Sequence, residues 1–375
     1  MISLEQKILA CSAELYPDSY QQQKLQRLML RCMDLDHLIG MAFDEGLTGF
    51  LYKNLTKSDL PDILDKRQIE TLRSLYHRNV IFNLKLIHDF KETLHQFNQK
   101  KIKVVPLKGI ILLKQVYEDI GLRQLTDIDL WILDGDYREI TQTLTVLGYR
   151  SDPVYPGTFR RDHTTIDLHF HILGAERIKA RKLLLSQSQS HFYNNAQSID
   201  FEGEEVLCLN KYDQIIYLSL HALKHNVDRL IWLVDIKSLV TSWKKSDWEA
   251  LINRVGYMGQ EKSVSYIFFL IRHLFDFYFP PEVSRALKLE KLHFMERKLL
   301  KERLKKGSLP IWGPLFLFSP DRGLWGRIYS ILETLFPRPE ILRQAFASSR
   351  NLKVWELYLK RVPQLIKMTK KPRQR

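Results

Sequence analysis

Two aspartates at alternate positions are the residues of this sequence whose types and spacing most clearly suggest chemistry. Asp127 and Asp129 begin the run DIDLWI, residues 127–132, in which polar and apolar positions alternate. Such alternation predicts a β-strand with one polar face, so both carboxylates point the same way. Like charges on one strand face repel each other and aspartate is depleted from strands, so the pair needs a compensating cation. A divalent metal ion is the natural candidate.

A third carboxylate is expected on a neighbouring strand. Residues 163–172, HTTIDLHFHI, also alternate, which predicts a strand with Asp167, His169 and His171 opposite its buried apolar face. Asp167 is therefore expected to join the aspartate pair. Two histidines on one strand face can bind zinc, but no third convergent ligand is evident, so we interpret them as structural or substrate-facing. His169 lies nearer Asp167 and is expected to orient a carboxylate or to contact phosphate.

The elements before the aspartate pair must position it. Residues 102–107 form a β-branched run that predicts a strand ending at Lys108-Gly109, and residues 110–117 contain no helix breaker. We therefore expect Gly109 at a strand-to-helix turn. In such a layout helix-terminal N–H groups hold phosphate, and carboxylates on the adjoining strand hold magnesium beside it.

These motifs together resemble a known family. Leu-Lys-Gly at 107–109, Asp-Ile-Asp-Leu at 127–130 and Ile-Asp-Leu-His at 166–169 are similar to the uncharacterised nucleotidyltransferase family. That family lies within the DNA polymerase β-like nucleotidyltransferase superfamily, and residues 221–239 resemble its helical half.

The resemblance implies an activity, a cofactor and a donor. Such an enzyme transfers a nucleoside monophosphate from a nucleoside triphosphate, with ATP as the expected donor, to an acceptor and releases pyrophosphate. Two magnesium ions would be held by the predicted catalytic residues Asp127, Asp129 and Asp167, with manganese as a substitute. The acceptor is expected to be a small molecule, a peptide or a protein, with RNA less favoured.

One departure from the superfamily pattern changes the expected phosphate contacts. The turn glycine is usually followed by serine, whose hydroxyl contacts the triphosphate, whereas Ile110 follows Gly109 here. We hypothesise that Lys108 and the amides at Gly109 replace that contact, as a point charge and an anion-binding helix end.

Further basic residues are candidates for the site. Arg123, in the turn before the aspartate pair, is expected either to neutralise phosphate charge or to pair with Glu118 or Asp119. In polymerase β-like enzymes a helical unit commonly closes over the base or the acceptor. The resemblance therefore implies that Lys224, His225 and Arg229 reach the substrate, and a solvated basic edge is an equal alternative.

The period of the apolar residues predicts an α+β fold, in which helical regions flank a small mixed sheet. The resemblance implies that this sheet is of the nucleotidyltransferase type. We expect an N-terminal helical region at 1–100, a catalytic core at 101–208 and a C-terminal helical region at 209–375. One long helix, or two, is expected at Lys66–Gln99. Further helices are expected at Lys211–Lys224, Asp228–Trp243, Asp247–Val255 and Lys262–Tyr278, and the sequence DLPD at 59–62 should interrupt the first region.

Two acidic positions carry local predictions. Asp235 lies in a helix that is otherwise apolar, so it must find a hydrogen-bonded or charged partner. Asp136 and Glu139 resemble a capping pair that opens a helix, and Gly148 should end that helix.

Composition restricts the class of partner and the compartment. The 375 residues include 57 Lys and Arg and 43 Asp and Glu, for a formal net charge of +14, which favours an anionic partner such as nucleotide, RNA or a membrane surface. Three scattered cysteines exclude a disulfide framework, and residues 1–16 lack a secretory signal, so a reducing cytoplasm is expected. Charged residues interrupt the apolar stretch 263–280, which predicts a buried helix and no transmembrane segment.

Other functions remain open on the same residues. A phosphotransferase would use the same carboxylates but release ADP. A non-catalytic nucleotide-sensing or interaction module is motivated by Ile110, which stands where a hydroxyl is expected. A nucleic-acid-binding protein would show affinity that falls steeply with salt, although the sequence contains no recognised RNA-binding motif.

Overall fold

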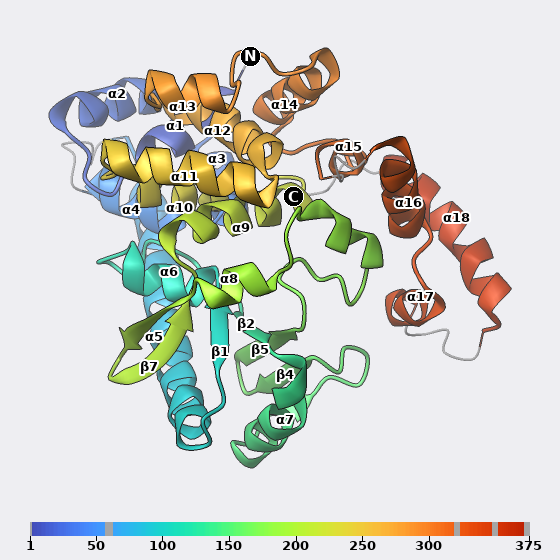
Figure 1. Cartoon of the computed structure of the whole chain (residues 1–375). Coiled ribbons are helices and arrows are strands. Elements are labelled where there is room, and N and C mark those ends of the chain that lie inside the picture. Colours follow the sequence, from blue (N-terminus) through green and yellow to red (C-terminus); the bar gives the residue numbers. More distant parts are fainter. Residues whose placement is uncertain (1, 57–62, 319–322, 347–351, 371–375) are drawn as a thin grey trace.

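A mixed five-stranded sheet carries the aspartates in the computed structural model, which describes residues 2–56, 63–318, 323–346 and 352–370 (Figure 1). The predicted α+β class is confirmed, because helical segments precede and follow this small sheet along the chain. The sequence DLPD at 59–62 lies outside the described residues. The strands, in spatial order, are β1 (Val104–Leu107), β2 (Ile128–Ile132), β5 (Thr164–His169), β4 (Thr158–Arg161) and β3 (Arg150–Ser151).

The register of the sheet brings distant motifs together. Strands β2 and β5 run parallel, and Asp129 is paired with Asp167. Strand β1 runs antiparallel to β2, with Leu107 opposite Asp129, so the residue after Leu107 emerges beside the carboxylates. Side chains of paired residues stand on the same face of a sheet. The pairing of β1, β2 and β5 therefore brings the motifs at 107–109, 127–130 and 166–169 together.

Long helix α5 (Lys66–Gln99) supports the sheet and confirms the predicted helix with the same ends (Figure 1). Asp65 caps it in a capping box with Gln68. Near its middle, the amide of Asn83 donates to the carbonyls of Ile120 and Arg123, at 2.6 and 2.7 Å, and so holds the loop that leads into β2. The helices before it are α1 (Leu4–Ser12), α2 (Ser19–Met29), α3 (Leu35–Glu45) and α4 (Thr48–Thr56).

The second half of the chain is helical, as predicted. The helices are α9 (Lys211–Lys224), α10 (Leu230–Val240), α11 (Lys245–Met258), α12 (Glu261–Phe275), α13 (Pro281–Ala286), α14 (Phe294–Lys306), α15 (Gly313–Leu317), α16 (Gly323–Leu335), α17 (Pro339–Ala345) and α18 (Val354–Lys370). The last three lie together at one side of the molecule (Figure 1). The apolar stretch 263–280 begins within α12, which is buried, and no helix among the described residues is long and apolar enough to cross a membrane.

Shorter elements complete the core: α6 (Gly109–Gln115), α7 (Tyr137–Val146), α8 (Ser190–Asn194), the hairpin strands β6 (Gln197–Phe201) and β7 (Glu204–Cys208), and the 3₁₀ helices η1 (Asp134–Asp136) and η2 (Lys179–Leu184). The predicted capping pair at α7 is wrong: Asp136 makes no capping hydrogen bond, because its backbone is already helical and continues from η1. Gly148 follows α7 with φ +86°, as expected of a helix-ending glycine.

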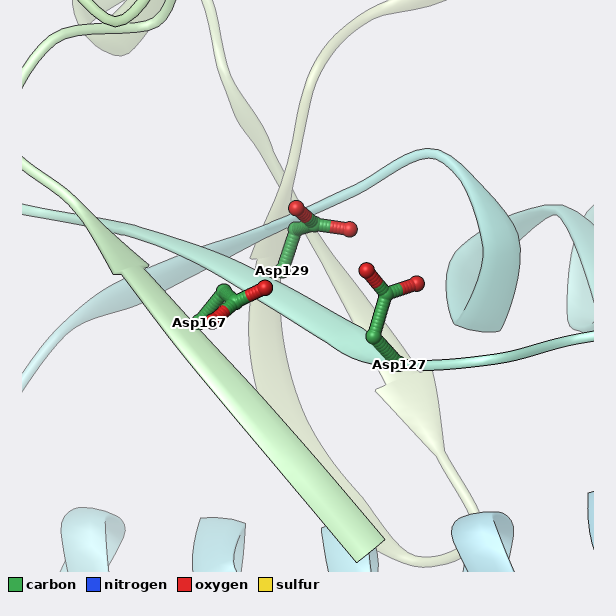
Figure 2. Close-up of side chains that lie close together, drawn as sticks. All are labelled: Asp127, Asp129 and Asp167. Carbon is green, nitrogen blue, oxygen red and sulfur yellow. The ribbon is translucent and has the colours of Figure 1, made fainter. Parts of the chain in front are cut away.

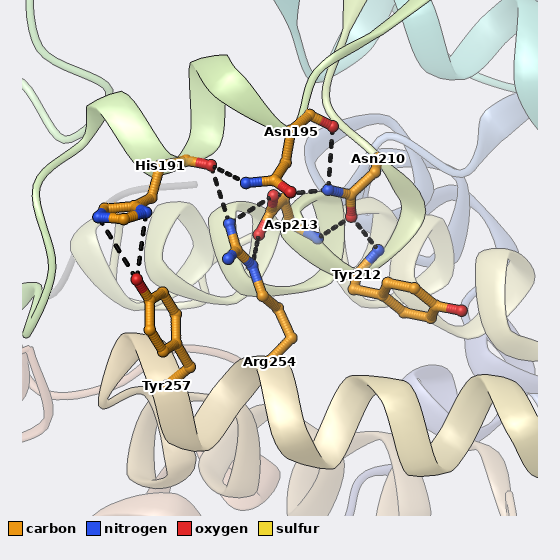
Figure 3. A network of polar contacts seen from close by, with 7 residues as sticks. All are labelled: His191, Asn195, Asn210, Tyr212, Asp213, Arg254 and Tyr257. Carbon is orange, nitrogen blue, oxygen red and sulfur yellow. Dashed lines mark hydrogen bonds and ion pairs between the residues drawn. The ribbon is translucent and has the colours of Figure 1, made fainter.

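A buried polar network ties α8 to the C-terminal helices (Figure 3). Asp213, at the start of α9, is fully buried and accepts hydrogen bonds from Arg254 Nε and Nη2 at 2.7 and 2.9 Å. Arg254 Nη2 also donates to the carbonyl of His191 in α8, at 3.0 Å. Asn210 caps α9 and donates to the carbonyl of Asn195, at 3.2 Å. The network joins residues on both sides of the predicted boundary at residue 208. The division into three regions stays a prediction.

Candidate active site

Three carboxylates converge where β2 and β5 lie side by side (Figure 2). Asp127 directly precedes β2, Asp129 lies within it and Asp167 lies on β5, and one oxygen atom from each can be chosen so that all three fall within 4.8 Å of one another. The structure thus brings together the three aspartates that the alternating runs predicted. Their service as metal ligands stays a prediction.

Burial of strand β2 makes this cluster different from an exposed acidic patch. All five residues Ile128–Ile132 are buried, so the strand has no solvated face, and Asp129 is only 5% exposed. A buried carboxylate costs free energy unless charge and hydrogen bonds compensate it. The residues around Asp129 supply that compensation.

Lys108 provides the nearest positive charge. Its Nζ lies 2.6 Å from Asp129 Oδ2 and 3.8 Å from Asp127 Oδ2. Burial disfavours the ammonium, but the two carboxylates outweigh burial and raise the pKa of Lys108. The backbone of Lys108 is left-handed, with φ +50°, which is uncommon outside glycine and often found at functional sites. Lys108 therefore neutralises the aspartates directly, and its predicted contact with phosphate is untested.

His169 is the second compensating group. Its Nε2 lies 2.8 Å from Asp129 Oδ1, and its Nδ1 lies 3.9 Å from Glu176 Oε1. Burial opposes protonation, but the bonds to the two carboxylates outweigh burial and raise the pKa of His169 to about 9. A protonated ring donates from both nitrogens. His169 therefore contacts a carboxylate, and its predicted role in orienting that carboxylate or contacting phosphate stays a prediction.

The aspartates respond in opposite directions to these surroundings. Burial would raise the pKa of Asp129, but Lys108 and His169 hold it well below its usual value. Burial and the neighbouring charge of Asp129 raise the pKa of Asp127. One member of the pair is thus firmly ionised and the other is less so, which is the pattern expected where carboxylates crowd together.

Arg123 has a different partner from either predicted one. Its Nε lies 2.9 Å from Asp235 Oδ1 and its Nη2 lies 2.8 Å from Asp235 Oδ2, and both residues are buried. Asp119 instead accepts hydrogen bonds from Lys53 and Tyr76. The prediction that Arg123 pairs with Glu118 or Asp119 is wrong, because α10 carries Asp235 to the loop that precedes β2. The prediction that Asp235 has a charged partner is confirmed.

This ion pair lies against the turn that carries Lys108. A Cβ atom built on Gly109 would lie 2.9 Å from Leu125 Cδ2 and 3.3 Å from Arg123 Nη1. A larger residue here would have to displace the ends of the Leu125 and Arg123 side chains, so glycine allows the close approach of the Arg123 guanidinium to the start of α6. Ile110 is fully buried in α6, so its side chain belongs to the core. The charge of Arg123 adjoins the turn, and its predicted contact with phosphate is untested.

The structure places the predicted substrate-contacting residues His225 and Arg229 at the edge of the helical half. Arg229 donates to the carbonyl of Asp44, at 3.2 Å, and to Gln124 Oε1, at 3.1 Å, so it links α10 to two other segments. His225 follows α9, and its ring lies 4.7 Å from that of His221 and 5.7 Å from that of Trp232. Contact of either residue with substrate stays a prediction.

Two site residues escaped the sequence analysis. Glu176 approaches His169, and Arg181 lies nearby in η2, in a segment without regular periodicity. Both residues follow β5, a strand of the site, in an irregular segment. Functional residues often lie in such segments, so this position is the signal that could have identified them.

Comparison with known proteins agrees with this geometry. The chain has no significant match among curated proteins or solved structures. A family described as "Uncharacterised nucleotidyltransferase" matches residues 31–276, which is well over half of the chain and runs from α3 to α12. The matched segment includes the three aspartates, Lys108 and the ion pair behind the turn. The chain therefore belongs to the uncharacterised nucleotidyltransferase family.

Proposed function

We propose that this protein transfers a nucleoside monophosphate from a nucleoside triphosphate, with ATP as the expected donor, to an acceptor hydroxyl group. The observation that carries the proposal is the convergence of Asp127, Asp129 and Asp167 beside the Lys108-Gly109 turn, in a chain of a nucleotidyltransferase family. The acceptor is proposed to be a small molecule, a peptide or a protein, and the compartment the cytoplasm.

The three carboxylates fit divalent metal ions. They offer hard oxygen donors whose atoms lie within 4.8 Å of one another, and such donors suit magnesium and manganese. Asp127 and Asp129 would hold two ions, and Asp167 would complete the ion on the acceptor side. When bound, the ions would polarise phosphoryl oxygens and neutralise charge that develops during displacement.

Asp167 is the proposed proton acceptor. The acceptor oxygen attacks the α-phosphorus and forms the new P–O bond, and the bond from that phosphorus to the oxygen bridging to the β-phosphate breaks. Its electron pair leaves with pyrophosphate, and the hydroxyl proton passes to the carboxylate of Asp167. Thr158 donates a hydrogen bond to Asp167 Oδ1 at 2.5 Å, which orients this carboxylate for that transfer.

Neighbouring residues keep the site preorganised. Lys108 and His169 hold Asp129 from two sides, so its carboxylate needs little rearrangement when substrate binds. Gly109 and Lys108 are proposed to approach the phosphates, and Arg123, whose charge is paired with Asp235, supports the turn from behind.

Calorimetry with ATP, GTP, CTP and UTP in the presence of magnesium, followed by product analysis, tests the proposal. Binding should require magnesium and should be lost in Asp127→Asn and Asp129→Asn. Asp162→Asn is the matched control, because Asp162 is an exposed aspartate on the turn between β4 and β5 of the same sheet. Release of pyrophosphate supports nucleotidyl transfer.

The rival functions predict other products. ADP would identify a phosphotransferase, and metal-dependent binding without turnover of any acceptor offered would favour a nucleotide-sensing module. A folded protein that binds none of the four nucleotides would overturn the proposal.

A further inference from the structure

Two positive side chains near the aspartates form no ion pair with a carboxylate among the residues that the structure describes. Lys224 is the last residue of α9, and no hydrogen bond or ion pair engages it within the described part of the chain. Burial, together with the charges of Arg181 and Lys108, lowers the pKa of Lys224 to about 8. Its ammonium is therefore partly desolvated in a positive environment.

Arg181, in η2, is the second such cation. Its Nη1 donates to the carbonyls of Leu173 and Gly174, at 3.2 and 3.3 Å, and no ion pair within the described residues neutralises it. Burial lowers the pKa of Arg181 to about 10. The two carbonyls fix one side of the guanidinium, and the charges of Glu176 and Glu333 oppose the effect of burial only in part.

Both cations converge on one point of the backbone. Gly174 has φ +69°, and a Cβ atom built on it would lie 3.1 Å from Arg181 Nη1 and 3.7 Å from Lys224 Nζ. Glu176 Oε1 lies 3.6 Å from the same point, but it is oriented toward His169, which in turn contacts Asp129. The cation pair therefore adjoins the carboxylate site.

The chemistry of the pair suits phosphate. Acidic residues nearby, Glu176 among them, offset the burial of these cations only in part, because no carboxylate contacts either of them at ion-pair distance among the described residues. Desolvated cations of this kind are costly to a folded protein, so their retention is explained if an anion binds them. A guanidinium offers a planar fork to phosphate oxygens, and an ammonium offers a point charge. A nucleoside triphosphate carries most of its negative charge on its two terminal phosphates.

We propose that Lys224 and Arg181 bind the β- and γ-phosphates of the donor and then hold the departing pyrophosphate. This inference rests on the proposed function and deepens it. It also accounts for Ile110, because positive charge from α9 and η2 would supply the phosphate contact that a hydroxyl after the turn glycine otherwise makes.

Pyrophosphate binding, measured by calorimetry on the full chain with magnesium, tests the inference. Lys224→Met and Arg181→Met should each weaken pyrophosphate affinity about tenfold to a hundredfold, the effect of losing one charge-assisted hydrogen bond. AMP, which lacks both terminal phosphates, should bind the parent and these variants equally. Lys182→Met is the matched control, since Lys182 is an exposed lysine of the same 3₁₀ helix and should leave pyrophosphate affinity unchanged.

Further readouts separate this role from a structural one and from the proposed function. Lys224→Arg should retain pyrophosphate affinity within a few-fold. Lys224→Met should not lower the thermal midpoint, because it breaks no hydrogen bond or ion pair among the described residues. Arg181→Met loses the hydrogen bonds to the carbonyls of Leu173 and Gly174, so its pyrophosphate affinity is measured below its own thermal midpoint. If the parent releases pyrophosphate from ATP while both methionine variants bind pyrophosphate as tightly as the parent, the inference is wrong and the proposed function stands. An equal loss of AMP affinity would also overturn it. A folded parent that binds neither ATP nor pyrophosphate would refute both this inference and the proposed function.

Discussion

Replacement of Asp235 by alanine is the sharpest test of how the site is supported. Asp235 is fully buried, and Arg123 is only 5% exposed. Arg123 donates to both carboxylate oxygens, and the hydroxyl of Tyr117 donates to Oδ1 at 2.6 Å. Asp235→Ala would leave the guanidinium buried without a counter-charge, against the turn that carries Lys108.

The expected cost follows from these bonds. A hydrogen bond to a charged group contributes about 1.5–3 kcal/mol, so the two short bonds from Arg123 together contribute about 3–6 kcal/mol. One-sided removal of a buried ion pair costs about 3–5 kcal/mol, in agreement with that range. We therefore expect Asp235→Ala to lower the free energy of unfolding by about 3–5 kcal/mol, a large part of the roughly 5–15 kcal/mol of a typical protein. Tyr117→Phe keeps the ion pair and should cost less.

Urea unfolding, followed by tryptophan fluorescence and far-UV circular dichroism, measures these differences. The double variant Arg123→Met/Asp235→Leu removes both charges and should be less destabilised than Asp235→Ala. Asp200→Ala, at an exposed position of β6, is the control and should cost only about 1 kcal/mol, because it loses a single exposed hydrogen bond, from the amide of Gly203. A cost below about 1 kcal/mol for Asp235→Ala, or a double variant whose cost equals the sum of its single variants, would refute the reasoning.

Three further predictions concern single side chains. Lys108→Met removes the ammonium beside Asp129, so the thermal midpoint of this variant in chelator should lie below that of the parent. Addition of manganese should raise the midpoint of the variant by more than that of the parent. An equal manganese response would argue against charge compensation by Lys108. His169→Gln keeps an N–H donor toward Asp129 and should retain most turnover, whereas His169→Ala should lose about tenfold or more in kcat; equal kcat values would exclude the orienting role. His171 is buried, and its Nδ1 accepts a hydrogen bond from the amide of Leu173 at 3.1 Å. Burial lowers the pKa of His171 from 6.5 to about 4, so the unfolded chain binds a proton that the folded chain does not. The free energy of unfolding should therefore decrease as pH falls below 6.5, by about 2 kcal/mol near pH 5. Urea titrations at several pH values should show that His171→Asn loses this component. An unchanged pH dependence in that variant would mean that His171 is not the group responsible.

Local periodicity in the sequence was enough to predict most of the secondary structure. The helices Lys66–Gln99 and Lys211–Lys224 have the predicted ends, because a period of 3.6 residues and the capping residues are properties of the local chain. The same kind of signal predicted that Asp127, Asp129 and Asp167 share one site, since alternation determines the face of each strand. The capping pair at Asp136 failed, because a preceding 3₁₀ turn had already made that backbone helical.

The path of the whole chain decided the partners of the charged residues. Arg123 pairs with Asp235, which is 112 residues away, and not with the acidic neighbours that its local sequence offers. The backbone of Lys108 has a positive φ and its ammonium lies against the carboxylates, and Arg181, which belongs to no motif, meets Lys224 of the segment 221–239 beside Gly174. Periodicity depends on backbone geometry within a few residues, whereas the partner of a buried charge depends on which segments the folded chain brings into contact. The sequence by itself therefore determined the elements and the candidate carboxylates, and the tertiary structure alone decided which cations surround them.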